Sequence, residues 1–179
     1  MAGTAAADVD DTQLTTPGVR PRPIGSDAYE RVLAWASLTL FAVALVAIGR
    51  GRPEWNRIPA LIWLHLATVL FATGLTPVIL LGRRGDRRHH KLGRVWSVAM
   101  IGTAAMTLGI RVVHPGHWSW IHLLSIWVLL FVPRLWWTAA HHRVEAHRRA
   151  VRGVVTGAIL IAGFFTFPFG RLMGRWLFG

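Results

Sequence analysis

Histidine is the residue type through which this sequence could hold a metal or a haem. The 179 residues include nine histidines and no cysteine. Without thiolates the chain forms no disulfide, no thiolate-ligated iron–sulfur cluster and no covalently attached c-type haem. Imidazole rings would have to hold any haem, so the spacing of the histidines decides which rings can meet.

Four of the histidines belong to an internal repeat. The stretch IWLHL at 62–66 recurs as SWIHL at 119–123, so His65 matches His122 at an offset of 57 residues, and His90 matches His147 at the same offset. Each unit has a histidine near the start of one apolar block, an arginine-rich loop, and a second histidine at the start of the next block. The repeat predicts a duplicated two-helix unit.

Apolar residues fall in five long blocks that predict transmembrane helices. Hydrophobic residues make up 53% of the chain and charged residues 16%, which is too little polar material to coat a soluble protein of this size. Each block has close to the roughly 20 residues that a helix needs to cross a bilayer. The predicted spans are Tyr29–Ile48, Ile58–Leu81, Val95–Val113, Trp118–Thr138 and Val151–Phe169.

The predicted fold class is an all-α integral membrane protein of about five transmembrane helices. Four of them, built from the duplicated unit, are expected to form a pseudo-symmetric bundle, with the first span packed outside it. Residues 1–27 are polar and proline-containing and predict a disordered cytoplasmic tail. Residues 28–179 predict a single transmembrane domain.

The basic residues predict the orientation in the membrane. With five spans, the amino-terminus, the second loop and the fourth loop share one side, which holds Arg20, Arg22, Arg31, Arg83, Arg84, Arg87, Arg88, Lys91, Arg94, Arg143, Arg148, Arg149 and Arg152. The other side holds only Arg50, Arg52, Arg57, Arg111, Arg171 and Arg175. The positive-inside bias therefore predicts a multi-pass protein of the bacterial inner membrane, with its amino-terminus in the cytoplasm and its carboxy-terminus outside.

This orientation predicts two layers of histidine. His65 and His122 are expected toward the outer face, and His90 and His147 toward the inner face, because spans two and four run opposite to spans three and five. A b-type haem takes an imidazole on each side of its iron, so the two pairs are candidate ligands of two haems that would carry electrons across the bilayer. Haem propionates need cations, and the candidates are Arg111 for the outer layer and Arg94 and Arg134 for the inner one.

The alternative is a membrane protein without a cofactor, either a small transporter or a structural subunit. Its histidines would be interfacial groups bonded to carbonyls or to each other, and its basic loops would bind the anionic head groups of cytoplasmic-leaflet lipids. The formal charge of +12 lies at the ends of apolar blocks, which indicates phospholipid rather than nucleic acid as the partner.

Two other kinds of site find little support in the sequence. The cationic surroundings of His89, His141 and His142 argue against a divalent metal there. No acid lies inside a predicted span, since Glu30 and Glu54 are at span edges. A carboxylate proton relay or a cation-coupled transporter is therefore not expected.

Several stretches of the chain resemble a known family. The strings IWLHLATVLFATGLTPVILLGRRGDRRHHKLGRVW, WIHLLSIWVLL, EAHRRAVRG and IAGFFTFPFGRLMG resemble bacterial membrane proteins grouped as domain of unknown function 2306, over roughly residues 58–175. That resemblance implies no activity. The four-histidine arrangement is more loosely similar to two-haem transmembrane b-type cytochromes of the ascorbate-dependent ferric-reductase type. This similarity implies the pairs His65–His122 and His90–His147 and a redox partner or quinone, although His90 and His147 lie beside arginine-rich loops, shallower than haem ligands in such cytochromes.

Overall fold

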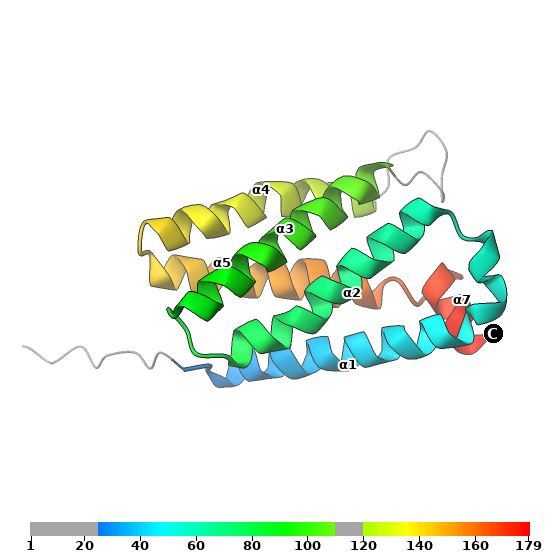
Figure 1. The fold of residues 1–179 in the computed structure, drawn as a ribbon, viewed down its shortest axis with the longest axis horizontal. Coiled ribbons are helices and arrows are strands. Elements are labelled where there is room, and N and C mark those ends of the chain that lie inside the picture. Colours follow the sequence, from blue (N-terminus) through cyan, green and yellow to red (C-terminus); the bar gives the residue numbers. More distant parts are fainter. Residues whose placement is uncertain (1–24, 110–119) are drawn as a thin grey trace, which may run out of the picture.

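Every regular element is helical in the computed structural model, which describes residues 25–109 and 120–179 (Figure 1). Most of the predicted tail, and Arg111, lie outside these residues. The elements are α1 (Ala28–Arg50), the 3-10 helix η1 (Arg52–Arg57), α2 (Ala60–Leu81), α3 (Arg87–Gly109), α4 (Trp120–Ala140), α5 (Val144–Val154), the π-helix η2 (Val155–Ile161), α6 (Ala162–Phe164) and α7 (Leu172–Phe178). The all-helical prediction is confirmed for the described part of the chain.

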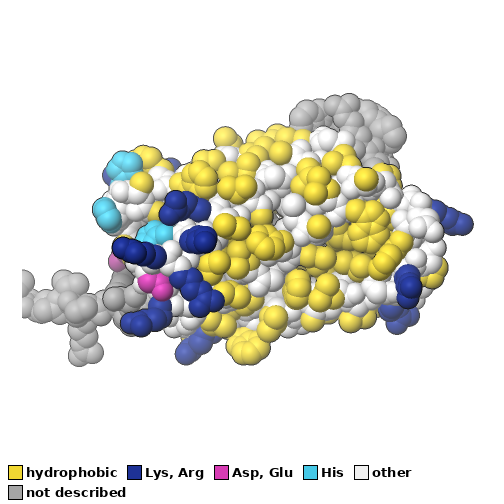
Figure 2. Space-filling model, viewed as in Figure 1, with side chains coloured by type: hydrophobic (Ala, Val, Ile, Leu, Met, Phe, Trp, Pro, Cys, Tyr) yellow, Lys and Arg dark blue, Asp and Glu magenta, His cyan; other side chains and the backbone are white. Residues whose placement is uncertain are grey.

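Three of the helices are long and apolar enough to cross a membrane: α1, α2 and residues His122–Ala140 of α4. Hydrophobic side chains cover the middle of the molecule, and most lysines and arginines in view lie at its two ends (Figure 2). Large apolar side chains such as Phe71 and Leu130 are 51% and 67% exposed. A surface this apolar is suited to lipid rather than water, so the chain is a membrane protein.

The third and fifth predicted spans begin earlier in the structure than the sequence indicated. Helix α3 starts at Arg87 rather than near Val95, and α5 starts at Val144 rather than near Val151. The hydropathy pattern marks where a helix meets lipid, whereas arginine and lysine are themselves good helix formers. Each of these helices therefore extends about two turns beyond its apolar part. Helices α5, η2 and α6 follow one another without a break from 144 to 164.

The first helix belongs to the bundle and does not lie outside it, contrary to the expectation. Consecutive helices from α1 to α5 pack against one another, and η2 packs back against α1. Leu33 and Ala34 of α1 share one buried core with Trp96 of α3, Val132 of α4 and Val154 of α5. The sequence repeat relates spans two to five only, so it gave no reason to place α1 between α2 and η2.

Tryptophans gather where α1 ends, at the predicted outer end of the bundle. The ring of Trp63 lies 5.3 Å from that of Trp55 and 6.2 Å from that of Trp176, between centroids. The Trp176 indole donates to Glu54 Oε2 at 3.2 Å. Trp176 also packs with Met173 against Ala47 of α1 in a second buried cluster. These contacts hold α7 against the end of α1.

Candidate functional site

His90 and His147 occupy equivalent positions in their helices. Helix α5 begins at Val144, 57 residues after α3 begins at Arg87, so each histidine is the fourth residue of its helix. The backbone amide of each donates to the carbonyl of the residue just before the helix, Asp86 for His90 (3.2 Å) and Arg143 for His147 (2.9 Å). The offset of the sequence repeat is therefore also the offset between the two helix starts.

The ring of His147 ties α5 to the end of α4. Its Nδ1 lies 3.1 Å from the Leu135 carbonyl oxygen and 3.5 Å from Thr138 Oγ1. A carbonyl oxygen only accepts, so Nδ1 carries the proton and Nε2 is the nitrogen with a lone pair. The ring of His90 has the same arrangement, with Nδ1 2.7 Å from the Asp86 carbonyl oxygen. His147 is half-buried, whereas His90 is exposed.

Burial and nearby cations lower the pKa of His147. Desolvation is the larger cause, and the Arg84 guanidinium and the His90 ring add to it, while the bond to Leu135 opposes it. Burial lowers the pKa of neighbouring His89 as well, and the His147 and His90 rings and Arg84 contribute to that shift. At neutral pH these two half-buried rings are therefore neutral, which is the form that coordinates iron or another metal.

Thermal stability in detergent is expected to fall as the pH is lowered below 6.5, the ordinary pKa of histidine. The unfolded chain then binds a proton at His147 that the folded chain resists, whereas above this pH the residue is neutral in both states. A His147→Gln variant should lose part of this dependence, and a variant of exposed His141 should keep it. Equal pH profiles for the wild type and His147→Gln would contradict the assignment.

His65 belongs to a chain of hydroxyl groups between α2 and α3. Thr107 Oγ1 donates to the Thr103 carbonyl at 2.9 Å and lies 3.4 Å from His65 Nδ1, so the ring donates to Thr107. Thr103 donates to Thr68 at 2.9 Å, and Thr68 donates to the His65 carbonyl at 2.8 Å. The sequence interpretation missed this network, although Thr103 and Thr107 are one turn apart on the same face of an apolar span. Such bonds hold membrane helices together.

The other predicted site residues are more scattered. His122 is half-buried near the start of α4, and α3 packs against both α4 and the α2 helix that carries His65. Arg134 is exposed on α4. Arg94 is exposed on α3, where its Nε donates to the His90 carbonyl at 3.4 Å. The structure thus brings His147 close to His89 and His90 at one end, and it bonds His65 to α3.

At the end of the bundle that holds His147, Glu30 has several charged partners and is only 2% exposed. Its carboxylate forms ion pairs with Arg148 at 3.0 Å, with Arg152 at 3.1 Å, and with Arg84 of the α2–α3 loop. Asp27 pairs with Arg148 at 3.3 Å and also with Arg152. We call these five residues the Glu30 cluster. It joins the start of α1 to the loop before α3 and to α5.

The chemistry of the Glu30 cluster is that of a structural clamp. Glu30 accepts from three guanidinium groups, and its bond raises the pKa of Arg148. A carboxylate with so many donors is poorly suited to take up a proton. The sequence interpretation missed the cluster. The available signal was the Asp27-x-x-Glu30 spacing of a capping box, which the structure contains in full.

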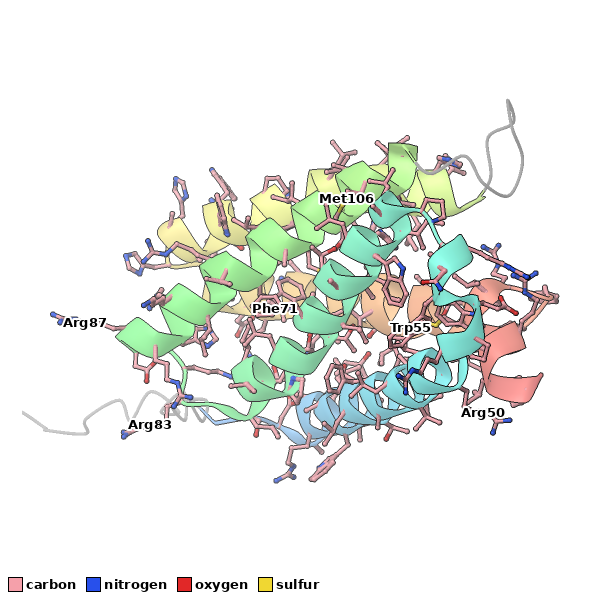
Figure 3. All side chains as sticks on the ribbon, turned by 45° about the vertical axis from the view of Figure 1, so that its right-hand side comes forward. Arg50, Trp55, Phe71, Arg83, Arg87 and Met106 are labelled. Atoms are coloured by element: carbon pink, nitrogen blue, oxygen red, sulfur yellow. The ribbon has the colours of Figure 1, made fainter. Side chains whose placement is uncertain are left out.

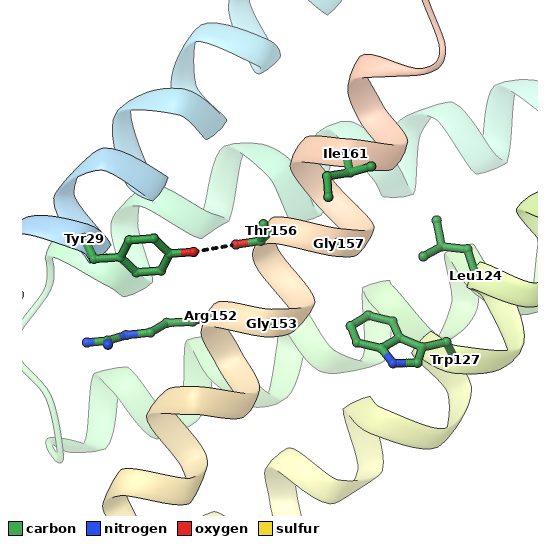
Figure 4. Close-up of a pocket in the computed structure, with 8 residues that line it drawn as sticks. All are labelled: Tyr29, Leu124, Trp127, Arg152, Gly153, Thr156, Gly157 and Ile161. Carbon is green, nitrogen blue, oxygen red and sulfur yellow. Dashed lines mark hydrogen bonds between the residues drawn. The ribbon is translucent and has the colours of Figure 1, made fainter.

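The surface of the described helices includes two open grooves of interest. One, of about 520 Å³, lies between α1, α4 and the α5–η2 run and is lined by Tyr29, Leu124, Trp127, Arg152, Gly153, Thr156, Gly157 and Ile161 (Figure 4). The Tyr29 and Thr156 hydroxyls are 3.1 Å apart in it. The other, of about 720 Å³, follows one face of α3 and is lined by Arg87, His90, Lys91, Arg94 and Val95. We call the second one the basic groove.

Comparison of the chain with protein-family models, with curated proteins and with solved structures finds no match. The described residues contain no group of three or more histidine and acidic side chains arranged to hold a metal ion. The histidines, the Glu30 cluster and the basic groove are the candidate functional features of the described residues.

Proposed function

We propose that the chain crosses the bacterial inner membrane five times, with its amino-terminus in the cytoplasm. The separation of charge along the bundle supports this topology: Arg83 and Arg87 lie at one end, and Arg50 and Trp55 at the other (Figure 3). The first end also holds the Glu30 cluster and the basic starts of α3 and α5. We assign the fifth crossing to the apolar part of the continuous helix from 144 to 164 together with the residues that follow it up to the start of α7.

Within that topology we propose transmembrane electron transfer through b-type haem. The supporting observation is the hydrogen bonding of the imidazole rings. His65, His90 and His147 each donate from Nδ1 to an oxygen, which leaves Nε2 free of a proton and able to act as the ligand nitrogen. Ligating histidines are commonly held in this way by their second nitrogen. The donor chemistry therefore fits haem, with His90 and His147 as the inner pair and His65 and His122 as the outer pair.

The residues of the chain would orient and neutralise such a group. Leu135 and Asp86 fix the tautomers of His147 and His90 through their carbonyl oxygens. At the inner end, haem propionates would pair with Arg94 and Arg134. Arg94 lies one turn after His90 on the same face of α3. A bound haem would supply a one-electron carrier. Relationship to the domain of unknown function 2306 and to two-haem cytochromes remains part of this proposal.

An absorption spectrum tests the haem proposal. Protein purified from cells supplied with a haem precursor is expected to show reducible Soret and alpha bands. Replacing His147 by Ala should remove the inner haem, and replacing His65 by Ala the outer one. His141→Ala is the matched control, because exposed His141 makes the same kind of Nδ1 bond, to the Trp137 carbonyl at 2.8 Å, and belongs to neither pair. Wild-type protein without reducible bands would reject the proposal.

A second candidate is a membrane protein without a cofactor, a small transporter or structural subunit. The observation in its favour is that the ring bonds of His65 and His147 connect adjacent helices, as packing contacts do. Under this alternative His65→Asn and His147→Asn lower stability and change no spectrum. The spectrum of the wild type decides between the two candidates.

A further inference from the structure

We infer that the basic groove of α3 binds an anionic phospholipid of the inner leaflet, with the head group on Arg87 and Lys91 and an acyl chain along Val95 and Val98. This inference rests on the proposed placement of the start of α3 at the inner face of the membrane. It does not depend on haem, because Arg87 and Lys91 are neither haem ligands nor propionate partners in the proposed function.

The three cations of the basic groove lack acidic partners among the described residues. The ion pairs at this end of the bundle belong to the Glu30 cluster, in which Glu30 and Asp27 neutralise Arg84, Arg148 and Arg152. The nearest acid in the chain, Asp86, caps α3 by accepting from the His89 backbone amide at 2.6 Å. Arg87, Lys91 and Arg94 are all exposed. Their positive charge is therefore available to an anion from outside the protein.

The spacing of these cations matches a lipid head group. Positions 87, 91 and 94 recur every three or four residues, so they share one face of the helix. Seven residues of α-helix rise roughly 10 Å, which is enough to surround a phosphate and the polar group attached to it. Arginine binds phosphate oxygens through paired N–H groups and lysine as a point charge. The amino-terminal end of a helix also favours negative charge.

The same face of α3 turns apolar where the cations end. Val95 lines the basic groove, and Val95 and Val98 are 42% and 59% exposed. A ligand lying along this face meets positive charge first and hydrocarbon next, the order of groups in a phospholipid at the inner leaflet. Free phosphate or a nucleic acid would use only the charged part. The apolar continuation is the reason to assign the groove to a lipid.

Lipid titration followed by native mass spectrometry tests the inference on the full chain in neutral detergent. Wild-type protein is expected to bind dioleoyl phosphatidylglycerol about tenfold more tightly than dioleoyl phosphatidylcholine, because basic residues at the membrane surface attract anionic lipid. The variant R87Q/K91Q, which keeps Arg94, should lose most of that preference. The matched control R50Q/R52Q removes the same number of charges from the opposite end and should retain it.

Two further measurements separate the explanations for a loss of binding. Val95→Ser/Val98→Ser should weaken phosphatidylglycerol binding severalfold with all charges present. Inorganic phosphate at the same concentration should not displace the lipid. Equal lipid preference in the groove variant and the control, or displacement by inorganic phosphate, would overturn the inference. Haem bands recorded on the same samples report on the proposed function separately, because R87Q/K91Q and R50Q/R52Q retain all four proposed ligands and the proposed propionate partners Arg94 and Arg134.

Discussion

Glu30→Gln is expected to destabilise the protein by about 3–5 kcal/mol, the usual cost of removing one member of a buried ion pair. The substitution leaves Arg84, Arg148 and Arg152 close together with only half-exposed Asp27 to neutralise them. Glutamine can still accept the Asp27 backbone amide in the capping box that begins α1, so the effect reports the lost charge. Unfolding in detergent followed by circular dichroism should show a fall in Tm on the order of 10 °C.

Glu54→Gln is the control for the loss of an acid near a helix end. Glu54 forms no ion pair within the described residues, and glutamine can still accept the Trp176 indole bond that the structure shows at 3.2 Å. Its Tm is expected to change little. If both variants melted alike, or if Glu30→Gln matched the wild type, the Glu30 cluster would not be the clamp described above.

Gly174→Ala is expected to detach α7 from the bundle. A methyl group at position 174 would lie 1.7 Å from the Phe167 carbonyl oxygen, a backbone atom that cannot rotate away. Helix α7 must shift away from the turn at Phe167, which disturbs the packing of Trp176 and Met173 against Ala47 of α1. Overpacking usually lowers the free energy of unfolding by about 1–3 kcal/mol, and a clash with a backbone atom is expected at the upper end of that range. Trp176 should become more exposed, shown by a red shift of tryptophan emission.

The control for this clash is another glycine replaced by alanine. Gly102 lies inside α3, and a methyl group there meets nothing within 4 Å. Since alanine is the better helix former, Gly102→Ala should be neutral or slightly stabilising. Faster trypsin cleavage after Arg171 or Arg175 in Gly174→Ala alone would show local detachment. Identical cleavage in the two variants would contradict the role given to Gly174.

The features that the sequence predicted well depend on local patterns. The length and position of the apolar blocks predicted α1, α2 and α4 to within a few residues, because hydropathy and helix geometry are properties of neighbouring residues. The repeat offset also recurs as the distance between the starts of α3 and α5. The starts themselves were placed too late, since residues such as Arg87 and Val144 extend a helix beyond the lipid, where hydropathy carries no signal.

The features that the sequence did not predict depend on contacts between distant residues. Glu30 meets Arg148 across 118 positions of the chain, and no local pattern says which arginine will pair with it. Helix α1 lies outside the repeat, so its contact with η2 had no counterpart from which it could be inferred. The hydrogen bond from His65 to Thr107 likewise joins two helices, and only the packed structure shows that this histidine contacts α3.

The membrane topology underlies both the histidine layers and the lipid groove, and cysteine labelling tests it most directly. The natural chain contains no cysteine, so single substitutions at Ser26, Asn56, His142 and Arg175 can be labelled in intact cells with a membrane-impermeant maleimide. Five crossings predict that Asn56→Cys and Arg175→Cys react from outside, whereas Ser26→Cys and His142→Cys, between α4 and α5, react only after the membrane is opened. Labelling of His142→Cys from outside would mean three crossings, and positions 26 and 175 reacting from the same side would mean an even number; either result would contradict this topology.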